Sequence, residues 1–459
     1  MNLIDASLRR PVTVILCTAA LVLFGLLSLQ TMGMQRLPDV DFPLVAVFTT
    51  MDGANATVID HDVTDVIEEQ LTGISGVENM NSYSFEGQGI TMIEFGLGRD
   101  VDAAAADVRD KVNLARSDLP DEAEAPIVYK FSMADDAVVV VAVLGDAPLV
   151  EKVTFVDKIA KGRLQSVDGV GNVGTPGLRK REIRIWLDPT KLEARNLTVS
   201  DISAAIRNKH VELPAGSVRT GTHKYELRMG GEYASVGELQ TLPVAVRPGG
   251  IVRLGDVSRV EDGFEERTGA ATYNGEDVIF LSIGKRRGAN EVSVANGVLE
   301  NLESLRNEAP AGVRLEVISN KADFVRRSMK GVLDDTWMAV ALTALIMLFF
   351  LQTFRATFVT VVTIPACLLG SFLLMRSMGI NINNLSMMGI SLSVGMVVDA
   401  TSVVLENVHR HMEDGAPALE ATAFGAKEVS FSVLGGGLTT IAVFAPVAFM
   451  GGIVGRFFY

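Results

Sequence analysis

Five stretches of this chain are apolar over most of their length and almost free of charge. A helix needs roughly 20 such residues to cross the hydrocarbon core of a bilayer. The stretches are residues 11–30, 337–351, 358–375, 385–408 and 429–449. We therefore predict five membrane-spanning helices. The first follows Arg9 and Arg10 without a convincing small-residue cleavage site, which favours a retained anchor over a removed signal peptide.

Basic residues near the predicted spans indicate their orientation. Arg9 and Arg10 precede the first span, Arg355 lies between the second and third, and Arg410 and Lys427 lie between the fourth and fifth. Lys and Arg are enriched in cytoplasmic loops, so we expect these three segments in the cytoplasm. Residues 31–333 and the last residues are then on the opposite side. The last residues are apolar and Gly-rich, which predicts that a further membrane span starts there. We therefore expect the chain to be a fragment of a longer protein.

The long polar segment between the first two predicted spans contains a repeat. A helical pattern at 63–71 is followed by Gly76 and Val77, and the same pattern returns at 156–164, followed by Gly169 and Val170. Apolar strands at 44–50 and 137–144 precede the two helices. Strands such as 89–97 and 183–187 follow them. This order predicts α/β sandwiches with the helices on one face of each sheet.

The second copy of the repeat is interrupted. After 183–187 the pattern predicts a helix at 199–209 and a polar hairpin or arm at 212–231. Strands at 251–254 and 278–283, a helix at 290–307 and a closing strand at 313–318 then follow. An inserted subdomain over 181–265 accounts for this order.

Composition supports a membrane protein with a large exported part. Of the 459 residues 48% are hydrophobic, and the net charge of -14 argues against a nucleic-acid partner. Both cysteines, Cys17 and Cys367, lie inside predicted spans. The exported segment therefore has no disulfide framework and must be stabilised by its own apolar core.

An aspartate, Asp399, interrupts the fourth predicted span. A charged carboxylate near the bilayer centre costs several kcal/mol, so it is tolerated mainly where it faces protein, binds a cation or exchanges protons. No Lys or Arg lies in the core of the five predicted spans. Asp399 is then either protonated much of the time through desolvation, or paired with a cation elsewhere.

The helix that carries Asp399 offers two further relay residues. Glu406 lies two turns away on nearly the same helix face, about 10 Å along the axis and near the cytoplasmic end. Thr401 is able to hydrogen-bond across helices, although such hydroxyl groups more often bond the preceding turn. We predict a proton relay of Asp399, Glu406 and Thr401. The alternative is that Asp399 only hydrogen-bonds a neighbouring helix and does not titrate.

Other candidate sites have simpler explanations. His409 and His411 point to different helix faces, so a metal site is not expected there. Met387, Met388 and Met396 are best explained as packing residues between helices. The chain has no phosphate-binding glycine loop with a lysine and no nucleophile constellation. We therefore expect neither a cofactor nor a metal nor enzymatic activity.

Four motifs resemble one family of transporters. They are RLPDVDFP at 36–43, RIWLDP at 184–189, FFLQTFRAT at 349–357 and GMVVDATSVVLENV at 395–408. Along nearly its whole length the chain resembles the amino-terminal half of a resistance-nodulation-division (RND) efflux pump of the AcrB-like hydrophobe/amphiphile branch. The resemblance implies a homotrimer in the bacterial inner membrane that exchanges drugs for protons, with a periplasmic adaptor (membrane fusion) protein and an outer-membrane channel as partners.

The resemblance also implies a domain organisation. An α-helical membrane domain would carry a large α/β periplasmic domain of repeated βαβ porter subdomains with an inserted docking subdomain. The expected parts are 1–33 with the first span, 34–134 as the first porter subdomain, 135–180 and 266–330 as the second, 181–265 as the docking subdomain, and 331–459 with spans two to five. In the family, a lysine from the second half supplies the charge opposite the aspartate.

One position departs from the drug-exporting pumps. These usually carry two adjacent aspartates in the fourth span, and here the second position is Ala400. This arrangement resembles heavy-metal exporters and the SecD protein-export subunit. The favoured function is a proton-driven exporter of amphiphilic small molecules. A metal-ion exporter of the same architecture and a SecD-like component are the alternatives, and the substrate is not predicted.

Overall fold

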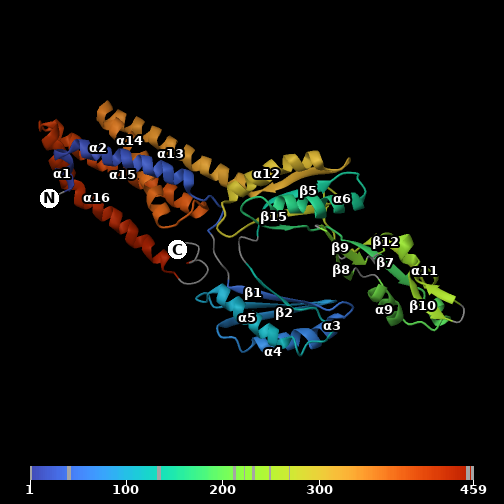
Figure 1. Cartoon of the computed structure of the whole chain (residues 1–459). Helices are drawn as coiled ribbons and strands as arrows, with labels where there is room; N and C mark the ends of the chain where they lie inside the picture. Colours follow the sequence, from blue (N-terminus) through green and yellow to red (C-terminus); the bar gives the residue numbers. More distant parts are fainter. Residues whose placement is uncertain are drawn as a thin grey trace.

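The chain folds into a bundle of long helices and a separate part built from small sheets and helices (Figure 1). The computed structural model describes residues 3–38, 43–131, 136–209, 213–221, 223–229, 233–247, 250–267, 269–450 and 455. A short helix, α1 (Leu3–Arg9), precedes the first long one. The prediction of a helical membrane part joined to a mixed α/β part is confirmed.

Five helices are long and apolar enough to cross a membrane. They are α2 (Pro11–Thr31), α13 (Lys321–Leu351), α14 (Phe354–Ser377), α15 (Asn384–Glu413) and α16 (Ala418–Ala448). A helix long and apolar enough to cross a membrane lies at each of the five predicted spans. Helices α13 and α16 extend N-terminal of the spans predicted from 337 and 429, because helical hydrogen bonding continues through polar first turns that hydropathy does not detect.

The bundle packs most closely where α2 crosses α14. A methyl group at Gly25 would lie 2.6 Å from the carbonyl carbon of Leu369, and one at Gly370 would lie 2.9 Å from Leu21 Cδ2. The buried apolar core of the bundle comprises Met32, Val325, Val340, Ile364, Leu368, Phe372, Ile382, Met387, Ile390 and Val394. Helix α16 packs mainly on α15 and diverges from the other helices (Figure 1).

The first sheet has the strand order β2-β3-β1-β4, with all neighbours antiparallel. Its strands are β1 (Leu44–Thr50), β2 (Val77–Phe85), β3 (Gln88–Phe95) and β4 (Ile127–Lys130). Helical turns α3 (Ala56–Ile59), η1 (Asp60–Thr64) and α4 (Asp65–Leu71), together with α5 (Val101–Ala115), share one apolar core with β1 and β3. The helices therefore cover one face, as predicted.

The second sheet repeats this arrangement with the order β16-β5-β15-β6. Its strands are β5 (Ala137–Leu144), β6 (Val170–Gly174), β15 (Ile279–Lys285) and β16 (Arg314–Asn320). The covering helices are α6 (Leu149–Phe155), η3 (Val156–Ala160), α7 (Lys161–Gln165) and α12 (Glu291–Glu308). Both units are β-α-β-β-α-β arrangements, which confirms the repeat.

A long segment between β6 and β15 forms a structure of its own. Strand β7 (Arg181–Leu187), predicted as the strand that follows the second repeat helix, lies outside the second sheet and pairs with β12 (Ser258–Phe264). Its place in the sheet is taken by β15. The segment has its own buried core of Leu192, Leu197, Ile202, Leu242, Val252, Leu254, Val257 and Val260.

Helices and hairpins complete this inserted segment. They are α8 (Pro189–Glu193), α9 (Val199–Lys209), α10 (Val236–Gln240), α11 (Leu254–Val257), and the pair β10 (Pro243–Arg247) and β11 (Gly250–Arg253). Strands β8 (Leu213–Thr220) and β9 (His223–Met229) form an antiparallel hairpin. The predicted hairpin is therefore confirmed over the described residues; 212, 222, 230 and 231 lie outside them. A small pair, β13 (Thr272–Tyr273) and β14 (Glu276–Asp277), follows the insert.

Candidate functional site

Helix α15 holds the predicted relay residues on one rigid element. Its start is fixed by a capping box in which Asn383 Oδ1 accepts from Ser386 N at 2.9 Å and Ser386 Oγ accepts from Asn383 N at 2.8 Å. The helix then continues through Asp399 to Glu413 without interruption. Asp399 therefore lies within one continuous helix that connects the capping box to Glu413.

Asp399 lies on a face of α15 that the other described residues leave uncovered. Met388, Leu392, Met396, Val403 and Glu406 are exposed with it. Their spacing of three and four residues aligns them along one stripe. The opposite face carries the buried residues Met387, Ile390 and Val394. No hydrogen bond or ion pair joins Asp399 to the described part of the chain, so its surroundings here are not a protein interior.

The other two relay residues do not contact Asp399. Glu406 is exposed on the same stripe, about 10 Å farther along the axis. Thr401 Oγ1 donates to the Val397 carbonyl at 2.7 Å, and Ser402 Oγ donates to the Val398 carbonyl at 2.8 Å. Both hydroxyl groups thus bond the preceding turn of their own helix. The three residues share one helix and no direct contact.

A polar cluster between α15 and α16 was missed by the sequence reasoning. Asn407 is buried, and its Nδ2 donates to the Gly425 carbonyl at 2.9 Å and to Glu428 Oε2 at 3.0 Å. Glu428 Oε2 also lies 2.9 Å from His411 Nε2 and 3.3 Å from Arg410 Nη2. His411 is thus paired with Glu428. The signal was an asparagine in one span and a glutamate immediately before the next.

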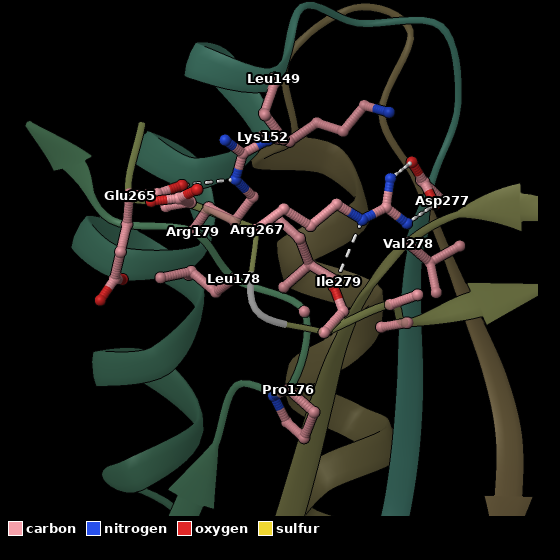
Figure 2. Close-up of a pocket in the computed structure, with 15 residues that line it drawn as sticks. Leu149, Lys152, Pro176, Leu178, Arg179, Glu265, Arg267, Asp277, Val278 and Ile279 are labelled. Atoms are coloured by element: carbon pink, nitrogen blue, oxygen red, sulfur yellow. Dashed lines mark hydrogen bonds and ion pairs between the residues drawn. The ribbon is translucent and has the colours of Figure 1, made fainter. Parts of the chain in front are cut away.

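The mixed α/β part contains a cavity of 510 Å³ where the chain leaves and re-enters the second sheet (Figure 2). Leu149, Pro176, Leu178, Val278 and Ile279 form apolar walls. Further lining residues are Lys152, Gly177, Arg179, Glu265, Glu266, Arg267, Gly269, Ala270, Ala271 and Asp277. Segments that are far apart in the sequence, residues 176–179 after β6 and residues between 265 and 279, before and within β15, line this cavity. A local sequence pattern therefore did not predict it.

Two arginines of this cavity are held in place by hydrogen bonds within the protein. Arg267 binds Asp277 through two hydrogen bonds of 3.0 and 2.8 Å, and Arg179 Nε donates to the Glu265 carbonyl at 2.8 Å (Figure 2). Lys152 forms no hydrogen bond or ion pair within the described residues, and its side chain is half-buried at the wall. The cavity thus combines apolar walls with a cation that is available to a ligand.

Comparisons with known proteins match the whole chain. Residues 3–459 match the AcrB/AcrD/AcrF family. Multidrug resistance protein MdtC of Escherichia coli O1:K1 / APEC is 33% identical over 458 residues, which is 99% of this chain and 45% of the relative. MdtC of Shigella sonnei (strain Ss046) gives the same values. The chain thus spans about half the length of the curated relatives it matches.

Proposed function

Because this chain belongs to the AcrB/AcrD/AcrF family of RND proteins, we propose that it is part of a proton-driven exporter of amphiphilic small molecules. Uptake and release of a proton by Asp399 drive movement of the exported part. Glu406 and Thr401 assist proton passage toward the cytoplasmic end of α15. The transporter lies in the bacterial inner membrane, with its large domain in the periplasm.

The observation that carries this proposal is the position of Asp399 on the uncovered stripe of α15. Apolar side chains flank the carboxylate there, and no cation within the described residues pairs with it. A charge in such surroundings is unfavourable in a membrane unless it is covered, paired or neutralised. Proton binding neutralises it reversibly, which makes the position of α15 sensitive to the proton gradient.

The exported part is proposed to handle the substrate. In this proposal the two sheets are porter subdomains (34–134, and 135–180 with 266–330), and residues 181–265 form a docking subdomain. The 510 Å³ cavity suits an amphiphilic molecule, because ligand sites combine apolar walls with a few fixed polar groups. A homotrimer with a periplasmic adaptor and an outer-membrane channel completes the export path.

Because Ala400 follows Asp399, two alternative functions remain, a metal-ion exporter and a SecD-like component. Soft metal ions are bound by thiolate, thioether and imidazole ligands. The described lining of the cavity contains no Cys, Met or His. This composition favours the amphiphile exporter over the metal exporter.

Replacing Asp399 with Asn in the complete gene product tests the proposal. Asn keeps the size and hydrogen-bonding capacity of the side chain but does not carry a proton. We expect export to be abolished in susceptibility assays while expression and assembly stay normal. The matched control is Asp414→Asn, at an exposed carboxylate just beyond α15. Full export by the Asp399 variant would reject the proton relay.

A further inference from the structure

Three buried polar side chains lie where the helix bundle meets the exported part. Gln35 and Glu291 are each 5% exposed, and Lys285 is 9% exposed. Buried charged groups are unfavourable unless they are hydrogen-bonded or paired. Neither the relay on α15 nor the cavity of the second sheet uses these residues. Their role must therefore be sought in the contacts they make.

Residues 33–36, which follow α2, are bonded to the loop that precedes α15. Ile382 N donates to the Gly33 carbonyl at 2.9 Å, and Gln35 N donates to the Ile382 carbonyl at 3.0 Å. Asn384 N donates to the Arg36 carbonyl at 3.2 Å. Ile382 is fully buried. Since the capping box of Asn383 joins this loop to α15, residues 33–36 follow any displacement of that helix.

Three of these four residues, Met34, Gln35 and Arg36, are also bonded to the second sheet unit. Glu291 N donates to the Met34 carbonyl at 3.0 Å, and Arg36 N donates to Glu291 Oε2 at 2.9 Å. Lys285 Nζ donates to Gln35 Oε1 at 3.4 Å. Glu291 is the first residue of α12, and Lys285 is the last residue of β15. Residues 33–36 thus connect α15 to both elements.

An ion-pair network adds the helix α13 to this junction. Asp136 Oδ2 lies 2.8 Å from Arg36 Nη2, and Asp136 Oδ1 lies 2.5 Å from Lys321 Nζ. Asp136 directly precedes β5, and Lys321 is the first residue of α13. The second sheet unit is therefore joined to the ends of three membrane helices, α2, α13 and α15, within one cluster of contacts.

We propose that residues 33–36 and Glu291 form a coupling latch, which transmits movement of α15 to α12 and β15. The latch rests on the proposed function, in which Asp399 moves α15, and assigns Glu291 as a positioning residue. Asn384 and Asp399 are about 22 Å apart along the helix. Coupling over such a distance is carried by contiguous rigid elements and hydrogen bonds, and the contacts above form such a chain.

Glu291 is suited to a latch with two arrangements. Its Oε2 accepts from Arg36 N, while its Oε1 is buried and has no hydrogen-bond partner among the described residues. Both Glu291 and Lys285 line a small cavity of 30 Å³. An unpaired buried acceptor is unfavourable, so a small displacement that brings a donor to Oε1 produces a second favourable arrangement.

Hydrogen exchange in lipid nanodiscs at constant pH tests the latch without a transport substrate. The Asp399→Asn substitution serves as a mimic of the protonated state. It is expected to change the exchange rates of the first turn of α12 and the end of β15 by roughly tenfold, the effect of about one hydrogen bond. In a protein that also carries Glu291→Ala, the hydrogen bond to Arg36 N is lost, so the change in exchange rate caused by Asp399→Asn is expected to fall below about twofold.

Matched variants separate coupling from folding. Glu291→Gln keeps an oxygen that accepts from Arg36 N, so the response is retained. Glu300→Ala, at an exposed position of the same helix, also retains it. Absence of any response to Asp399→Asn in the otherwise unmodified chain, or a full response in the Glu291→Ala chain, would overturn the latch. Export by the Asp399 variant would instead reject the proposed function, because this exchange comparison does not depend on transport.

Discussion

The crossing of α2 and α14 allows a sharp test of how closely the membrane helices pack. We predict that Gly25→Ala destabilises the bundle. The added methyl group would lie 2.6 Å from the carbonyl carbon of Leu369 and closer still to its oxygen. Backbone atoms do not rotate away, so α2 and α14 must separate. Overpacking of this kind costs about 1–3 kcal/mol.

A glycine on another membrane helix provides the control. Gly435 of α16 has no heavy atom within 4 Å of an added methyl group. Replacing Gly by Ala in a helix gains up to about 1 kcal/mol of intrinsic propensity, and this gain is common to both variants. Their difference therefore isolates the packing cost of about 1–3 kcal/mol.

Thermal unfolding in detergent, followed by the fraction that remains monodisperse on size exclusion, measures this difference. Each kcal/mol lost from the free energy of unfolding lowers the thermal unfolding midpoint of the helix bundle by about 2–4 °C. Gly25→Ala is thus expected to unfold at least about 2 °C below Gly435→Ala. Equal midpoints for the two variants would mean that α2 and α14 are not in backbone contact, and the packing argument would be refuted.

Two further predictions concern the inserted segment. Deleting residues 218–228 removes most of the β8–β9 hairpin and should lower the trimer fraction in size-exclusion light scattering; an unchanged trimer would exclude the hairpin as an interlock between protomers. The second concerns the ion pair of Arg181 and Asp262, in which the hydrogen bond from Arg181 lowers the pKa of Asp262. The pair therefore stabilises the β7–β12 pairing at pH values above the usual aspartate pKa of about 3.9. This stabilisation is lost as the pH falls through the lowered pKa that Asp262 has in the folded protein. In Asp262→Asn, hydrogen exchange of β7 and β12 should be faster than in the unmodified chain near neutral pH, and this difference should shrink in acid; a difference that is independent of pH would contradict the assignment.

The uncovered stripe of α15 bears on the proposed proton coupling. Any surface that covers Leu392, Met396 and Val403 must also accommodate the Asp399 carboxylate. A covering cation would attract the charged form, and loss of the charge on protonation would weaken that contact. The strength of packing against α15 would then depend on the protonation of one group, which is what the proposed coupling to a proton gradient requires.

Local patterns in the sequence determined the secondary structure of much of the chain. Strands β1 and β5 and helix α9 have the boundaries that their apolar spacing predicts. Their side chains alternate or recur with the period of one element, and that information lies within a few neighbouring residues. The position of Asp399 in an apolar helix was likewise evident, because length and hydropathy alone identify a span.

Tertiary structure alone decided which elements meet. The sequence predicted a strand at 183–187 but not its partner β12, because pairing between distant strands has no local signature. The polar contacts of residues 33–36 with Ile382, Asn384 and Glu291 join three separate segments, and each segment by itself is an ordinary loop or helix start. The uncovered side of α15 was also not predictable, since helical periodicity defines a stripe but the packing of neighbouring helices decides which stripe stays exposed.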